Sequence, residues 1–159
     1  MGDTAIPRAV AGEFAVQGSL LERYSKRFSG TEINSTFYRS HRTSTYIRWR
    51  DAVPSTFRFS IKVPKTISHE KRLADVDREL TEFLIETSGL GDRRGPLLLQ
   101  LPPKFAYEGS VAEHFFRLAR SLFIGPLVLE PRHPSWFGGE AESMLIDSRR
   151  AMKPAHFIS

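Results

Sequence analysis

Four polar side chains recur late in the apolar segments of the chain: Asn34, Lys62, Gln100 and Glu130. In parallel α/β folds, the carboxyl ends of the strands build the functional site. A carboxylate, an ammonium group and two amides gathered there could bind a polar small molecule. Glu130 would then act as an acid or base or stabilise a cation, and Lys62 would bind an anionic group or hold Glu130 ionised.

The segment Thr31–Phe37 carries the first of these side chains and reads as a strand. Successive side chains of a strand point to opposite faces, so Glu32 and Asn34 share one face. We expect Glu32 to lie one layer deeper than the late-strand residues, beside Ser60. In this interpretation Glu32, Asn34 and Gln100 bind and orient a substrate.

Two histidines follow expected strand ends, and imidazole is the side chain best suited to proton transfer near neutral pH. His69 or His133 could therefore shuttle a proton, although either could equally anchor its loop. Glu130 follows a run of apolar residues, and a buried carboxylate is unfavourable without a partner. Lys62, two strands away, is the nearest expected cation, and Arg132 or His133 could also reach the carboxylate.

Trp136 stands in a loop beside Arg132 and His133, where it could roof a pocket or stack on a ligand ring. A metal site would need Glu32, Glu130 and a histidine to converge. No paired-histidine spacing, glycine-rich nucleotide fingerprint or phosphate loop is visible, so we expect no metal and no cofactor. The competing interpretation is a buried polar network that closes a layer of the fold and binds nothing.

The elements that would position these residues follow from hydrophobic periodicity, which predicts one helix and then four strand–helix units. The expected strands are 31–37, 57–63, 96–101 and 126–130, and helices are expected from 19, 46, 75, 110 and 140 onward. Such alternation predicts right-handed crossovers and a parallel sheet. Both an open α/β sheet and a (β/α)8 barrel fit this pattern.

Local signals add detail to these elements. Ser19 with Glu22, and Ser110 with Glu113, have the spacing of capping boxes at helix starts. Residues 96–101 are apolar except for one glutamine, which is typical of a strand buried on both faces.

Composition places the chain among ordinary globular proteins, since 40% of its 159 residues are hydrophobic and 26% are charged. There is no cysteine, which excludes thiolate chemistry and favours a cytoplasmic location. No apolar run approaches the roughly 20 residues that cross a bilayer, and we expect no membrane contact. The net charge of +5 permits nucleic-acid or phosphate binding, but the basic residues are scattered.

Four motifs in this order are similar to the YecE-like family, family 72 of the domains of unknown function. They are Glu32-Ile-Asn-Ser-Thr-Phe-Tyr38, Lys62-Val-Pro-Lys-Thr-Ile-Ser-His69, Leu99-Gln-Leu-Pro-Pro103 and Glu130-Pro-Arg-His-Pro-Ser-Trp136. The resemblance implies a TIM-type (β/α)8 barrel with the motifs at strand ends around its mouth. It implies no reaction.

The resemblance runs from about Ile6 to about Leu145. The family's first strand, of the type Ile-Gly-Thr-Ser-Gly-Trp, is replaced here by Met1-Gly-Asp-Thr-Ala5, and a full barrel takes about 250 residues. We therefore expect a fragment: a partial (β/α)8 barrel with about four strand–helix units. The expected divisions are an irregular segment 1–18, the barrel part 19–148 and an unpatterned tail 149–159.

Three partner classes follow. An unknown small molecule at the strand ends is the first, and nucleic acid is the second. The third is self-association, because an incomplete barrel leaves two open sheet edges. A fragment without function remains an alternative.

Overall fold

The computed structural model describes residues 19–150 of the chain. Its centre is a four-stranded parallel sheet whose strands lie in sequence order, β1-β2-β3-β4. The strands are β1 (Gly30–Ile33), β2 (Arg58–Lys62), β3 (Arg94–Gln100) and β4 (Leu127–Glu130). The predicted α/β class and parallel sheet are confirmed.

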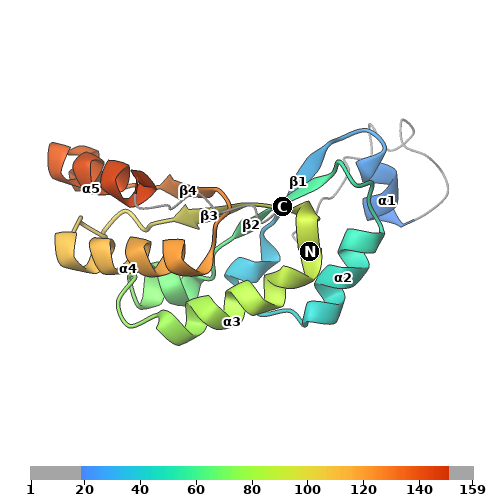
Figure 1. Cartoon of the computed structure of the whole chain (residues 1–159), viewed down its shortest axis with the longest axis horizontal. Coiled ribbons are helices and arrows are strands. Elements are labelled where there is room, and N and C mark those ends of the chain that lie inside the picture. The colour runs from blue at the N-terminus through green and yellow to red at the C-terminus, as the bar shows by residue number, and fades with distance from the viewer. Residues whose placement is uncertain (1–18, 151–159) are drawn as a thin grey trace, which may run out of the picture.

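Helices connect the strands, and Figure 1 shows α2, α3 and α4 along the same side of the sheet. The α-helices are α1 (Leu20–Ser25), α2 (Thr43–Asp51), α3 (Asp77–Thr87), α4 (Gly109–Leu122) and α5 (Gly139–Arg150). Short turns of 3-10 or π helix are η2 (Ser35–Phe37), η3 (Thr66–Glu70), η4 (Ser88–Arg93) and η5 (Pro134–Phe137). β1, β2 and β3 are therefore each followed by a helix on the same face of the sheet (Figure 1), as strand–helix units require.

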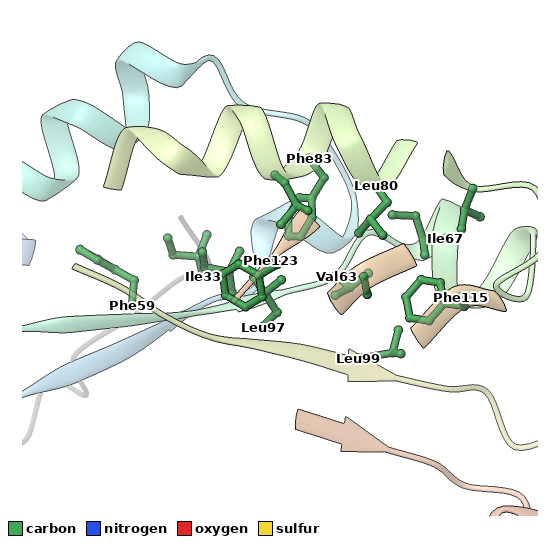
Figure 2. Close-up of a cluster of buried hydrophobic side chains, with 14 of the residues drawn as sticks. Ile33, Phe59, Val63, Ile67, Leu80, Phe83, Leu97, Leu99, Phe115 and Phe123 are labelled. Carbon is green, nitrogen blue, oxygen red and sulfur yellow. The ribbon is translucent and has the colours of Figure 1, made fainter. Parts of the chain in front are cut away.

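The core lies between the sheet and these helices (Figure 2). Alternate strand residues point toward the helices, and α3 and α4 return apolar side chains toward the sheet. The labelled members with at most 3% of their surface exposed are Ile33, Phe59, Val63, Ile67, Leu80, Phe83, Leu97, Leu99 and Phe115. Burial of this apolar surface is the main driving force for folding. It agrees with the strand predicted over 57–63 and the helix predicted from 75 onward.

The opposite face of the sheet is polar and partly open. Parallel partners in register share a face, and the register pairs Glu32 with Ser60, Lys62 with Leu98, and Gln100 with Glu130. We call this the open face: Glu32, Ser60, Lys62, Leu98, Gln100, Val128 and Glu130. All of these side chains are half-exposed or exposed.

The first strand is shorter than its pattern predicts. β1 ends at Ile33, and η2 begins at Ser35. The Thr36 hydroxyl lies 2.9 Å from the Ile33 carbonyl and 2.6 Å from the Lys62 carbonyl, and it shares its proton between them. These two bonds hold the turn that follows β1 and bury Thr36, so the strand predicted over 31–37 was too long.

β3 also differs from its prediction. Its burial alternates, with Leu97 and Leu99 buried and Leu98 and Gln100 half-exposed. The interpretation of a strand buried on both faces was therefore wrong for the described residues. The apolar Leu98 belongs to the open face, because only alternate residues of the strand point toward the helices.

Of the two capping boxes, the one at Ser19 and Glu22 is confirmed. The second is wrong, because α4 begins at Gly109 and its N-cap, Glu108, makes no side-chain cap bond. α5 continues to Arg150, past the expected boundary at 148. The irregular segment 1–18 and residues 151–159 lie outside the described residues.

Candidate functional site

Three of the four late-strand side chains share the open face at the carboxyl ends of the strands. Gln100 and Glu130 are in register on β3 and β4, and the Gln100 amide donates to the Glu130 carboxylate at 2.9 Å. Lys62 lies one layer deeper, because its register partner is Leu98. The side chains therefore occupy two layers of the sheet, whereas equal depth was predicted.

The cation that pairs with Glu130 is Arg132, whose guanidinium lies 3.3 Å from the carboxylate. The run of apolar residues before Glu130 predicts a buried carboxylate, but the Glu130 side chain is 46% exposed. The hydrogen bond from Gln100 lowers the pKa of Glu130, and Arg132 and the charge of Lys62 lower it further. Glu130 is therefore ionised at neutral pH and suits a cation-stabilising role better than that of a general acid.

Lys62 and His69 meet at the ring of Phe37. The Lys62 ammonium lies 4.6 Å from the ring centroid, and the His69 ring stands edge-on at 5.0 Å. Cations bind the faces of aromatic rings in this way. Phe37 therefore holds Lys62 and His69 close together in the deeper layer of the site.

His69 is positioned by η3, which begins directly after Lys65. Ile67 is fully buried beneath this turn, and the Ser68 hydroxyl lies 2.8 Å from His69 Nδ1. Burial lowers the pKa of His69, and the charges of Lys62 and Arg132 lower it further. The imidazole is consequently neutral at pH 7 and able to accept a proton.

The loop after β4 agrees with one of the two roles expected for His133 and differs from the role expected for Trp136. His133 Nδ1 accepts from the Ser135 amide at 3.2 Å and caps η5, which makes His133 a loop anchor. Trp136 is only 2% exposed, and its indole N–H donates to the Phe105 carbonyl at 2.8 Å. The structure thus places Trp136 in the core and not over an open pocket.

The two remaining candidates lie at β1. Glu32 is exposed on the open face in register with Ser60, one layer deeper than Lys62 as predicted. Asn34 is exposed just past the strand, and its side chain makes no cap bond to η2. In the described part of the chain, neither side chain hydrogen bonds to Lys62, Gln100 or Glu130.

Sequence reasoning did not single out Phe37 or Thr36 as parts of the site. Thr36 bonds the Lys62 carbonyl, and Phe37 carries the Lys62 ammonium and the His69 ring. Their signal was the placement of a hydroxyl and an aromatic ring directly after a strand end. That signal was hidden by the assumption that the strand continued to Phe37.

Among residues 19–150, no three His, Asp or Glu side chains gather in a way that could hold a metal ion. In the same range, no helix has the length and apolar character needed to span a bilayer.

Comparison with known proteins identifies relatives. The sequence profile of the family described as "Protein of unknown function DUF72" matches residues 13–159. UPF0759 protein YecE of Escherichia coli K12 is 38% identical over 127 residues, which are 79% of this chain and 46% of YecE. The match continues to Ser159, so the expectation that the resemblance ends near Leu145 was wrong.

Solved structures agree at the level of the fold. A DUF72 family protein from Enterococcus faecalis V583 superposes with a TM-score of 0.66 at 21% identity, covering 82% of this chain and 55% of that one. One from Thermotoga maritima MSB8 gives 0.62 at 23% identity, covering 77% of this chain and 48% of that one. The chain thus spans about half the length of these relatives.

Proposed function

Because this chain belongs to the DUF72 family, whose function is unknown, we propose its activity from the site alone: an enzyme site for a small anionic molecule. One observation carries the proposal. At the carboxyl end of β2, the Lys62 ammonium and the His69 ring meet at Phe37, 4.6 and 5.0 Å from its ring centroid, and burial together with the charges of Lys62 and Arg132 lowers the pKa of His69. Perturbed titratable groups gathered at such an edge are typical of functional sites.

Each residue has a role in this proposal. Lys62 and Arg132 bind a carboxylate or phosphate group of the ligand, because ammonium and guanidinium groups pair with such anions. His69 accepts a proton from the bound ligand. Glu130 holds Arg132 in place through their 3.3 Å contact, and Gln100 holds Glu130 through its 2.9 Å hydrogen bond.

The proposal includes a (β/α)8 barrel as the setting of this site. The strand order β1-β2-β3-β4, with helices on one side, is the arrangement of half of such a barrel. Parallel sheets are normally covered on both faces, and here one face stays open. We propose that the open face is the barrel interior and that its second wall corresponds to the additional length of the relatives.

A binding screen tests the proposal. Inorganic phosphate, phosphorylated metabolites and small carboxylates are added to the protein, and histidine ring resonances are followed by NMR. We expect a ligand that moves the His69 resonances, with affinity at least tenfold lower in Lys62→Met and Arg132→Met. Lys26→Met, an exposed lysine at the end of α1, is the matched control.

The screen has two outcomes that would contradict the proposal. In one, no anion moves the His69 resonances in either this chain or a longer relative. In the other, ligands bind equally well to the site variants and to Lys26→Met. Either result leaves Lys62, His69 and Arg132 as structural residues.

The second candidate is nucleic-acid binding, which the net charge of +5 favours. In that case the bound anion would be a backbone phosphate. The affinity for a short oligonucleotide would then fall steeply with salt, since binding releases counterions. A salt-independent affinity, or no binding at low salt, would remove this candidate.

A further inference from the structure

Phe37 also lines a cavity of about 230 Å³ that is separate from the polar residues of the open face. Its walls come from η2 and the loop that follows, from α3, and from Tyr46 of α2. Sites for drug-sized ligands are typically about 300–1,000 Å³, so this cavity fits a group the size of one side chain. None of the residues proposed above to bind the anion or to transfer the proton lines it.

One wall of the cavity is acidic. Glu79, Glu82 and Glu86 lie at spacings of three and four residues on α3, which places them on one face of the helix. Glu79 pairs with Lys71 at 2.7 Å, and Glu82 lies 3.8 Å from Arg78.

Glu86 differs from the other two glutamates. Its carboxylate accepts a hydrogen bond from the Ser40 hydroxyl at 2.5 Å, and within residues 19–150 it makes no ion pair. Arg39 is the one basic residue in the cavity lining of the described chain. Since Glu79 and Glu82 already lie beside Lys71 and Arg78, Glu86 is the carboxylate of the described lining that remains available to a cationic ligand.

An independent feature of the cavity is the hydroxyl of Tyr46. Tyr46 is 0% exposed, and among the described residues its hydroxyl has no hydrogen-bond partner. Burial raises the pKa of Tyr46 above its usual range, and the charge of Glu86 raises it further. A buried hydroxyl without a partner is unfavourable, and a ligand in the cavity that supplies the missing bond would remove this cost.

We propose that this cavity binds an alkylguanidinium group whose planar head lies between the Glu86 carboxylate and the Tyr46 hydroxyl. A guanidinium carries five N–H donors in a fixed plane, and both oxygens can accept from it. Its alkyl stem packs against the rings of Phe37 and Tyr38, which line the same cavity. Aromatic faces also attract the cation itself.

The probe is n-butylguanidinium, and n-butylurea is the neutral control of the same shape. Binding is followed through the backbone amide resonances of residues 36–40 and 79–86 in the whole chain. We expect butylguanidinium to move these resonances and butylurea to leave them unchanged.

Two variants remove the proposed contacts and keep the shape of the side chains. Tyr46→Phe and Glu86→Gln should each weaken butylguanidinium binding at least fivefold. Tyr46→Phe removes an unpaired hydroxyl, so the fold should persist and the resonances should stay assignable. Glu142→Gln, an exposed carboxylate on α5, should bind as the unaltered chain does.

Three results would overturn the proposal. They are equal binding of butylurea, unchanged affinity in both Tyr46→Phe and Glu86→Gln, or no response to butylguanidinium, which would mean that the cavity holds water only. Lys62→Met should leave this binding unaltered. A failure of the anion site and a failure of this cavity are therefore distinguishable.

Discussion

The same four strands present two faces with opposite properties. Toward the helices, Ile33, Phe59, Ile61, Leu97 and Leu99 are at most 2% exposed. On the open face, Val128 is 48% exposed and the side chain of Glu130 is 46% exposed. Alternation along each strand produces this difference, because neighbouring residues point to opposite sides.

Stability and function are therefore divided between the helix-covered face and the open face of the sheet. The helix-covered face carries the hydrophobic burial that holds the sheet. The open face carries Gln100 and Glu130, which hydrogen bond to each other, and Lys62, whose ammonium lies over the Phe37 ring. Changes on one face should therefore alter folding, and changes on the other should alter binding.

The largest expected effect comes from the covered face. Phe59→Ala should lower the free energy of unfolding by about 3–5 kcal/mol, because it leaves a cavity between the sheet and the helices. Urea melts followed by circular dichroism measure this loss. Val128→Ala, in the same sheet but on the open face, should cost under about 1 kcal/mol, because an exposed side chain gains little from burial.

Size exclusion with light scattering gives this comparison its control. If Val128→Ala costs as much as Phe59→Ala, the open face is covered in solution. The proposed self-association through the open edges would then appear as a dimer or larger species. A monomer with equal losses at both positions would contradict the division between the faces.

The second largest effect is expected at the junction between the faces. Thr36→Val removes a buried hydroxyl that bonds the carbonyls of Ile33 and Lys62. We expect a loss of about 1–3 kcal/mol in unfolding free energy, since both carbonyls lose a partner. Thr36→Ser keeps the hydroxyl and should recover most of that loss. An unfolding free energy that is unchanged in Thr36→Val would contradict this prediction, because that variant keeps a γ-methyl group and removes only the hydroxyl.

Much of the fold could be predicted from periodicity. The strand at β2 and the helix at α3 were predicted correctly, because burial on one face leaves a period in the sequence. The end of β1 could not be read, since the Thr36 hydroxyl bonds a carbonyl 26 residues away in the chain. Hydrophobic periodicity describes neighbouring residues only and carries no information about such a long-range bond.

The candidate site was predicted less completely. Gln100 and Glu130 meet as expected, because equal positions in parallel strands fall into register. Trp136 was misplaced, since nothing in the loop sequence shows that its indole would bond the Phe105 carbonyl. The cytoplasmic location and the absence of a cofactor stay predictions.

A smaller effect is expected in the titration of His69. Its pKa should lie below the ordinary 6.5, and Lys62→Met or Arg132→Met should raise it, because each removes a nearby positive charge. The unfolded chain then binds more protons than the folded one just below pH 6.5, so stability falls as pH drops through that window. NMR titration measures the pKa, with Lys26→Met as the control. If the pKa of His69 is the same in both variants as in the unaltered chain, Lys62 and Arg132 do not affect His69.

The smallest effect is expected from Glu130→Gln. Its carboxylate is paired with Arg132 but exposed, and exposed ion pairs contribute about 0–1 kcal/mol. The lowered pKa of Glu130 adds stability above its ordinary 4.5 that is lost as pH falls through the folded-state pKa, and solvent screening keeps this term small. Urea melts at pH 7 and pH 3.5 measure both quantities against Glu142→Gln. A loss well above 1 kcal/mol at pH 7 would mean that Glu130 is desolvated in solution, and the open face would then have a cover like that of the helix-covered face.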